Sequence, residues 1–237
     1  MADKVAVIVG VGPGLGSAVA KRFAREGFAV ALLARGNDKL EPVQTAIDGA
    51  GGHALSLTVD ATDPAAVTAA FASIKADLGP VDVLVYNAGS FKIAGILDIT
   101  PEVFDACWKA NCAGALYAVQ QVLPDMVDRA AGTVIFTGAT AANRGGSNFA
   151  CLAVGKFGLR ALAQSTAREF GPKGVHVAHV VIDGMIDIPQ TRAMFPDKKD
   201  EQMLSPDAIA DTYWHLHLQH PTAWTQEVDL RPAVEKF

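Results

Sequence analysis

Short apolar runs alternate with longer stretches of helical spacing along the whole chain. The first run, at residues 5–9, is continuous and rich in β-branched residues, which predicts a strand buried on both faces. Similar runs predict six further strands, and the stretches between them place apolar residues on one helical face, as Val19, Ala20, Phe23 and Ala24 do. The predicted strands lie at 5–9, 29–34, 55–59, 81–86, 132–137, 175–182 and, in short form, 228–230.

The expected helices begin at recognisable signals. A proline suited to the first helical position occurs at each of the starts 63–64, 100–101 and 205–206, and Asn37 is expected to cap the helix that follows the second strand. Long helices are expected at 101–123 and 148–170. This order predicts an α/β fold, a three-layer doubly wound parallel sheet of Rossmann type, in one domain over 1–237. The long irregular connection at 185–204 is a candidate substrate lid.

Composition narrows the class of protein. The 237 residues are 50% hydrophobic and 19% charged, enough for a core without disulfides or metals. The net charge of -5, with no basic run, argues against nucleic acid as a partner. No apolar stretch reaches the roughly 18 residues that span a bilayer. Residues 1–4 lead into the first strand without a signal-peptide pattern, and the three cysteines form no C-x-x-C pair, so a cytoplasmic location is expected.

Histidines gather near the end of the chain. His215, His217 and His220, with Asp211, do not place three ligands on one helical face, so a solvated helix end is expected there and no metal site.

A glycine cluster follows the first strand. Gly10, Gly14 and Gly16 have the spacing G-x-x-x-G-x-G, whereas the more general G-x-G-x-x-G spacing is not met. Glycines at such a turn let the backbone approach a pyrophosphate, and the N-terminus of the following helix favours its charge. The loop is therefore predicted to bind a nucleotide, although a plain turn remains the alternative.

Further motifs occur in a characteristic order. Asp60 follows the third strand, and Asn87-Ala88-Gly89 follows the fourth. Asn111 lies in a long helix, and Lys156 matches the lysine of a Y-x-x-x-K motif. Together with the glycine loop, these residues resemble the short-chain dehydrogenase/reductase family over about residues 4–230. The resemblance implies that the cofactor is bound by Gly10, Pro13, Gly14, Leu15, Gly16, Arg35, Asp60, Ala61, Asn87, Ala88, Gly89, Lys156, Gly184 and Ile186.

The end of the second strand bears on which cofactor is used. Sites for NAD usually hold an acidic residue there, whereas an arginine suits the 2′-phosphate of NADP. Here the strand runs into Arg35, and the first carboxylate comes at Asp38. A guanidinium can form paired hydrogen bonds to a phosphate. We therefore expect NADP(H) to be preferred over NAD(H).

The catalytic positions depart from the family pattern. The tyrosine that donates a proton is replaced by Leu152, and the serine about 13 residues before it by Ala139. Asn111 and Lys156 remain as the catalytic residues that the resemblance implies. General acid catalysis contributes about 10²–10⁴-fold, so ordinary ketone reduction should be impaired.

Candidate sources of a replacement proton are few. They are a water held by Asn111 and Lys156, and the side chains of Thr137, Thr140, Arg144 and Ser147. On the substrate side, Asp183 stands where the family usually has proline, and Ile188 where it has threonine.

Two functions follow from these residues. The first is an NADP(H)-dependent oxidoreductase that transfers hydride to or from a small carbonyl compound or an activated alkene. The alternative is a catalytically impaired cofactor-binding sensor or scaffold subunit. The resemblance also implies a homodimer or homotetramer formed through the helices at 101–123 and 148–170.

Overall fold

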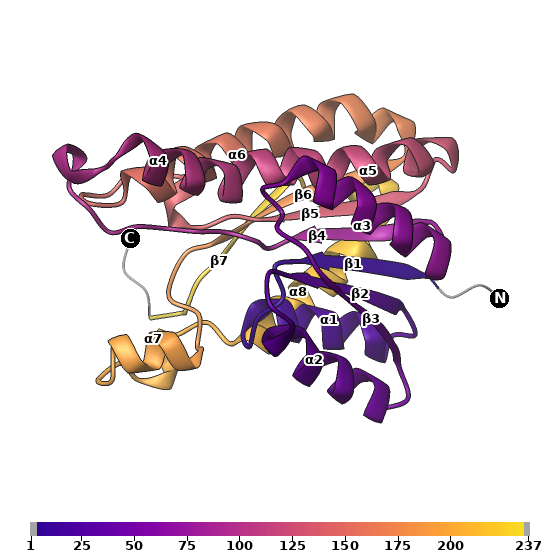
Figure 1. The fold of residues 1–237 in the computed structure, drawn as a ribbon, viewed down its shortest axis with the longest axis horizontal. Coiled ribbons are helices and arrows are strands. Elements are labelled where there is room, and N and C mark those ends of the chain that lie inside the picture. The colour runs from indigo at the N-terminus through magenta and orange to yellow at the C-terminus, as the bar shows by residue number, and fades with distance from the viewer. Residues whose placement is uncertain (1–3, 235–237) are drawn as a thin grey trace.

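A seven-stranded sheet forms the centre of the computed structural model, which describes residues 4–234 (Figure 1). The strand order is β3-β2-β1-β4-β5-β6-β7, and every neighbouring pair is parallel. The order reverses between β1 and β4, which is the switch point where doubly wound sheets bind ligands. The strands are β1 (Val5–Val9), β2 (Ala29–Ala34), β3 (His53–Thr58), β4 (Val81–Tyr86), β5 (Gly132–Thr137), β6 (Val175–Ile182) and β7 (Glu227–Leu230).

Helices cover both faces of the sheet and make three layers (Figure 1). One face carries α1 (Leu15–Arg25), α2 (Asn37–Gly49) and α8 (Pro206–His217). The other carries α3 (Pro64–Asp77), α4 (Pro101–Trp108), α5 (Gly114–Asp128) and α6 (Ala150–Phe170). Because both faces are covered, β1, β2 and β6 are buried along their whole length, and for β1 this is what its continuous apolar run predicted. The predicted fold class is confirmed.

Several predicted boundaries were wrong by a few residues. Asn37 is the first residue of α2 and makes no capping bond, because Gly36 occupies the N-cap in extended backbone. The helix expected from residue 148 begins at Ala150, since Asn148 has a left-handed backbone (φ 67°) that a helix cannot continue. The third strand starts at His53, where it pairs with Ala29.

The long helix expected at 101–123 is interrupted. It consists of α4, a π-helical turn at Lys109–Ala113, and α5, which extends to Asp128. The connection at 185–204 is also less irregular than expected, because it contains α7 (Pro189–Met194) and a bridge between Ile186 and Leu204. Within residues 4–234, the structure has no helix that is long and apolar enough to cross a membrane.

Candidate active site

The glycine loop and the segment after β4 pack directly against each other. Gly10 has φ +96°, and a Cβ at this residue would lie 2.4 Å from the backbone nitrogen of Ala88. The Asn87 Nδ2 donates to the Gly10 carbonyl at 2.9 Å, and a Cβ at Gly16 would lie 2.5 Å from the same oxygen. Only glycine fits at residue 10, where a left-handed backbone and a close approach coincide. The contact brings two motifs that are distant in sequence to one edge of the sheet.

Two adjoining cavities at this edge form one groove. Their volumes are about 250 and 410 Å³, which together fall in the range of about 300–1,000 Å³ typical of ligand pockets. Both are lined by Gly10, Gly12, Pro13, Asn87, Gly89, Ser90 and Gln190. The groove contains every residue expected to hold the cofactor except Gly184, which instead packs near Pro232 and Leu204.

One end of the groove is basic. Arg35 and Lys39 both line it, and the nearby carboxylate of Asp38 turns back towards Gly36 instead. Lys39, in the first turn of α2, was not among the expected residues, and no helical spacing links it to Arg35, which precedes the helix. The end of β2 therefore presents two cations to the groove.

Asp60 lies across the same end of the groove. Its carboxylate accepts from the backbone N–H and the hydroxyl of Thr62, at 2.9 and 2.8 Å. The backbone hydrogen bond, with help from the hydroxyl and from the charge of Arg35, holds the pKa of Asp60 below its ordinary value. The carboxylate is thus charged and oriented at neutral pH.

At the opposite end lies Asn111, in the π-helical turn. Its side chain is fully buried, and its Nδ2 donates to the Ser90 carbonyl at 2.5 Å and to the Cys107 carbonyl at 2.8 Å. A π-helical turn frees backbone groups from the regular ladder and often marks a functional site. The two bonds fix the orientation of the amide.

Lys156, on α6, is the charged group at this end. It is 6% exposed, and its Nζ donates to the Thr137 carbonyl at 2.7 Å. Burial lowers the pKa of this ammonium to about 8. Lys156 therefore exchanges its proton closer to neutral pH than an ordinary lysine does.

The chain offers few hydroxyl groups to this part of the groove. Leu152 lines it, in the position where the family has tyrosine. The Thr137 hydroxyl is bonded to Tyr213 at 2.9 Å on the α8 side of the sheet, and Thr140 donates to Asp183 at 2.7 Å. Tyr86 donates to the carbonyl of Ala110 at 2.8 Å. The expectation that Thr137 could supply a hydroxyl was wrong, because the pleat of β5 turns its side chain away from α6.

Asp183 lies buried at the end of β6, where it anchors the loop after β5. Besides Thr140, two guanidinium groups approach its carboxylate, from Arg144 at 3.8 Å and Arg231 at 3.5 Å. Asp183, which stands in place of the family's usual proline, therefore forms polar contacts that hold the loop carrying Thr140 and Arg144.

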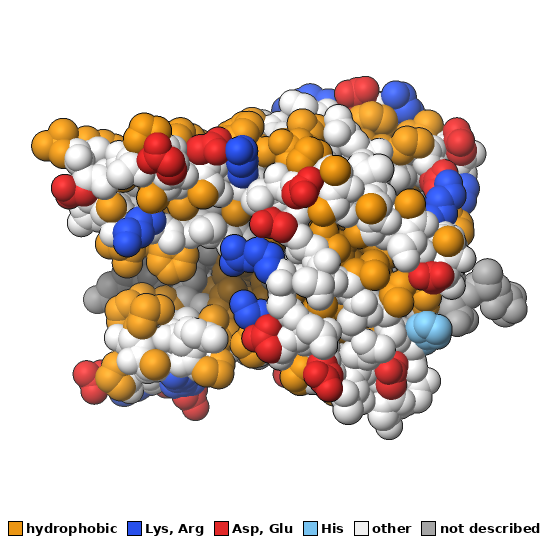
Figure 2. Space-filling view, viewed as in Figure 1, with side chains coloured by type: hydrophobic (Ala, Val, Ile, Leu, Met, Phe, Trp, Pro, Cys, Tyr) orange, Lys and Arg blue, Asp and Glu red, His pale blue; other side chains and the backbone are white. Residues whose placement is uncertain are grey.

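The 185–204 segment lies over the glycine loop. Ile186, Ile188 and Gln190 line the groove, and the Cγ2 of Ile188 lies 2.4 Å from where a Gly14 Cβ would stand. Figure 2 shows the molecule hollowed between α7 and the layer that carries α4 and α6, with hydrophobic side chains on both walls. Exposed apolar side chains in the segments beside it include Phe91, Ile93, Met194 and Phe195.

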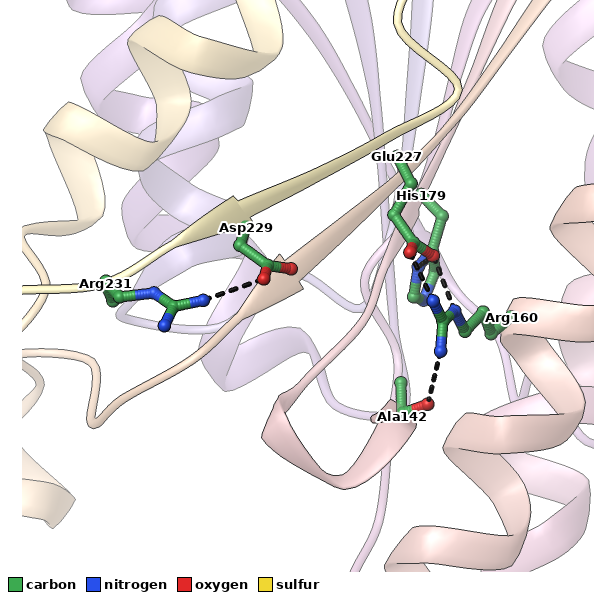
Figure 3. Close-up of polar contacts among 6 residues, drawn as sticks. All are labelled: Ala142, Arg160, His179, Glu227, Asp229 and Arg231. Atoms are coloured by element: carbon green, nitrogen blue, oxygen red, sulfur yellow. Dashed lines mark hydrogen bonds and ion pairs between the residues drawn. The ribbon is translucent and has the colours of Figure 1, made fainter. Parts of the chain in front are cut away.

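A partly buried ionic cluster joins Arg160 and Glu227 (Figure 3). Arg160, one helical turn after Lys156, donates to both carboxylate oxygens of Glu227, at 2.7 and 2.5 Å. Its third nitrogen donates to the Ala142 carbonyl at 3.4 Å, and His179 Nδ1 lies 3.0 Å from Glu227. The cluster joins α6, β6, β7 and the loop after β5.

Of the histidines near the C-terminus, His215 and His220 are exposed, as the expected solvated helix end implies, whereas His217 is packed against the core. His217 Nδ1 pairs with the Thr133 hydroxyl at 2.9 Å, and its ring packs against Phe23, Phe28 and Trp214. Burial lowers its pKa to about 4, so the ring is neutral and structural. Within residues 4–234 the structure gathers no group of three side chains suited to hold a metal ion.

The groove fits a dinucleotide. Nothing lies within 4 Å of the side-chain position of Gly12, so the glycine loop has room for a pyrophosphate beside the start of α1. The basic end suits a phosphorylated ribose, and Lys156 and Asn111 lie at the other end. Sheet, switch point and groove thus define a dinucleotide-binding α/β protein.

Comparison with known proteins gives the family. The model for short chain dehydrogenases matches residues 4–199. A 3-oxoacyl-(acyl-carrier-protein) reductase, MabA, from Mycobacterium avium is 35% identical over 188 residues, 79% of this chain and 69% of that protein. The chain belongs to the short-chain dehydrogenase/reductase family of NAD(P)-dependent oxidoreductases.

Solved structures agree with this assignment. A short-chain dehydrogenase from Rhodopseudomonas palustris is 38% identical with a TM-score of 0.82, covering 98% of this chain and 99% of that one. A metagenomic short-chain oxidoreductase solved in complex with NADP is 29% identical with a TM-score of 0.85, covering 98% of each chain. Both similarities therefore extend beyond the nucleotide-binding part of the sheet.

Proposed function

We propose that the protein is an NADP(H)-dependent oxidoreductase that transfers hydride to or from a small carbonyl compound or an activated alkene. One observation carries the proposal: a single groove has two cations at one end and a buried lysine and asparagine at the other. The glycine loop lies between them. This is the order in which an extended dinucleotide presents its phosphorylated ribose, its pyrophosphate and its reactive ring.

The preference for NADP(H) rests on Arg35 and Lys39. Paired donors of a guanidinium match phosphate oxygens, and the ammonium adds a second charge. The Asp38 carboxylate at the end of β2 turns towards Gly36, so it would not repel a 2′-phosphate bound there. The NADP bound in the metagenomic relative supports the same preference.

The chemistry divides between cofactor and chain. When bound, the reduced nicotinamide supplies a hydride to a substrate carbon. Asn111 and Lys156 are proposed to act at that end, where the groove has lost both usual hydroxyl donors. Substrates whose reacting atom needs little protonation, such as enones and enoyl thioesters, suit such a site. The name of the mycobacterial relative also supports testing 3-oxoacyl thioesters.

Leu152 and Ala139 favour a second function. A cofactor-binding subunit without turnover would keep the groove and lose the hydroxyls, as this chain does. The two functions differ in a measurable way, because both bind NADPH and only the first oxidises it.

The experiment combines binding and turnover. NADPH and NADH are titrated by fluorescence, and NADPH oxidation is then followed with ketones, aldehydes, enones and acyl thioesters. Tighter binding of NADPH and oxidation with at least one substrate class are expected. Tighter binding of NADH would refute the cofactor preference, and tight NADPH binding without any turnover would favour the subunit.

Self-association is a separate proposal. Exposed apolar side chains lie along the helical layer of α4, α5 and α6: Phe104, Trp108, Leu116, Val154 and Phe157. Apolar patches of this kind usually mark an interface. A homodimer or homotetramer through this layer is expected, and scattering that shows a monomer at micromolar concentration would contradict it.

A further inference from the structure

One polar side chain of the 185–204 segment borders the whole groove. Gln190, the second residue of α7, lines both of the adjoining cavities. It is exposed, and its side-chain amide makes no hydrogen bond within residues 4–234. A carboxamide has two N–H donors and a carbonyl acceptor, so Gln190 brings unused hydrogen-bonding capacity to the place where the two cavities meet.

The neighbours of Gln190 in the segment cannot take the same part. Ile186 and Ile188 line only the cavity at the lysine end, and their side chains are apolar. Pro189 has no N–H to donate. Among the side chains of residues 185–204, all of which the structure describes, Gln190 is therefore the only hydrogen-bond donor that lines the groove.

The glycine loop borders the same part of the groove. Gly12 and Pro13 line both cavities, as Gln190 does. The contact of Ile188 with the Gly14 position holds the segment against this loop, two residues before Gln190. A pyrophosphate that rests on the loop and the start of α1 therefore has Gln190 beside it.

The middle of the groove carries no cationic side chain of the described residues. Arg35 and Lys39 line one cavity alone, and Lys156 lines the other alone. The negative charge of a pyrophosphate in the middle must therefore be met by N–H groups of the backbone and of neutral side chains. The Gln190 amide has such groups, and they have no competing partner within the part of the chain that the structure describes.

The backbone that carries Gln190 is held in place from below. Arg192, two residues further on, donates to both carboxylate oxygens of Asp187, at 2.6 and 2.7 Å, and to Asp200 at 2.6 Å. The bridge between Ile186 and Leu204 closes the base of the segment. Only the side chain of Gln190 must then be ordered on binding, which keeps the entropic cost of the contact small.

We propose that Gln190 binds the pyrophosphate of the dinucleotide, with its amide N–H groups donating to phosphate oxygens. This inference rests on the proposed function. It makes the 185–204 segment, expected as a substrate lid, a determinant of cofactor affinity as well, through one uncharged side chain.

The main test is a series of charges at residue 190, with the Kd of NADPH measured by fluorescence titration. Gln190→Leu should raise the Kd by about 10-fold, the low end of what a hydrogen bond to a charged group contributes, because the site is exposed. Gln190→Glu should raise it further, since like charges repel, and Gln190→Lys should bind at least as tightly as the wild type. A loss below threefold in Gln190→Leu, or a Kd for Gln190→Glu no higher than that for Gln190→Leu, would overturn the proposal.

The matched control places the same charge elsewhere on α7. Ala193 is exposed and does not line the groove, so Ala193→Glu should change the Kd of NADPH by less than twofold. An effect as large as that of Gln190→Glu would show that the charge acts at a distance and not by contact, and would count against the proposal.

Fragments of the cofactor locate the contact. In Gln190→Leu, 2′-phospho-ADP-ribose, which has the pyrophosphate but no nicotinamide, should lose as much affinity as NADPH does. Adenosine 2′-phosphate, which reaches only the Arg35 end, should bind within twofold of its wild-type affinity. Unchanged binding of 2′-phospho-ADP-ribose, or an equal loss for adenosine 2′-phosphate, would remove the contact from the pyrophosphate and refute the assignment.

The wild type separates the two levels of inference. A wild type that fails to bind NADPH refutes the proposed function. A wild type that binds NADPH, with Gln190→Leu equally tight, refutes only the role of Gln190. Because the Gln190 side chain makes no hydrogen bond within residues 4–234, the urea midpoint of each variant should match that of the wild type, and this confirms that the titrations compare folded proteins.

Discussion

Glu227→Gln is expected to destabilise the fold by about 2 kcal/mol at pH 7. Both carboxylate oxygens accept from Arg160, at 2.5 and 2.7 Å, and His179 lies 3.0 Å from one of them. A hydrogen bond to a charged group contributes about 1.5–3 kcal/mol. The side chains of Glu227 and Arg160 are 24% and 32% exposed, which places the value towards the low end. Glutamine keeps one oxygen and turns an NH₂ group towards a donor.

The assay is a double-mutant cycle in urea, with Arg160→Met as the second change and the protein concentration held fixed. For a chain of this size, 2 kcal/mol corresponds to a fall in Tm of about 4–8 °C. We expect a coupling free energy of about 1.5–3 kcal/mol. The control is the pair Lys75 and Asp125, at 2.8 Å with the lysine 61% exposed, whose coupling should stay below about 1 kcal/mol. A coupling of about 0.5 kcal/mol or less in the Arg160 pair would refute the reasoning.

The pH dependence has a definite sign. Burial opposes the charge of Glu227, but the bonds from Arg160 and His179 outweigh it and hold the pKa of Glu227 below its ordinary value. Its contribution to stability is therefore present above the unfolded-state pKa of about 4.3 and is lost as the pH falls through the folded-state value. The difference between wild type and Glu227→Gln should be full at pH 7 and smaller at about pH 3.5.

Three further changes test the groove. Leu152→Tyr with Ala139→Ser should raise kcat for a ketone by about 10²–10⁴, because it restores a general acid; a change below threefold would show that the pocket lacks the geometry for it. Arg35→Ser should raise the Kd of NADPH by about 10–100-fold and leave that of NADH nearly unchanged, with a smaller effect for Lys39→Ser; equal losses for both cofactors in fluorescence titrations would contradict the assignment. Gly10→Ala should cost about 2 kcal/mol or more in urea unfolding, since φ +96° and the contact with the segment after β4 both oppose a methyl group; an unchanged midpoint would be evidence against that constraint.

Much of the fold could be predicted because burial on both faces leaves a clear record in sequence. The strands at 81–86, 132–137 and 175–182 were predicted with the bounds they have, since each is a dense apolar run between turns. The interruption of the long helix expected at 101–123, by contrast, could not be predicted from the local sequence pattern. Within its π-helical turn, Asn111 donates to the carbonyl of Ser90, a contact with another loop that spacing cannot show.

The residues of the candidate site could be predicted from the sequence, whereas the directions in which their side chains point could not. The order of motifs located Asn87 and Lys156 on the groove, but it could not show that the Thr137 hydroxyl faces α8. Alternation along β5 indicates two faces, and only the packed structure shows which helix covers each. Lys39 was missed for a similar reason, because its place beside Arg35 depends on how α2 leaves the sheet.

The contact of Ile188 with the glycine loop has a thermodynamic consequence. The same loop that is expected to receive the pyrophosphate carries the methyl group of a residue from the 185–204 segment, only 2.4 Å from the Gly14 side-chain position. A ligand that alters this contact alters the free energy of the segment's position. By reciprocity, whatever fixes the segment over the substrate changes the affinity of the glycine loop by the same factor. Cofactor binding and substrate binding are thus expected to be coupled through the 185–204 segment, which Ile188 places against the glycine loop.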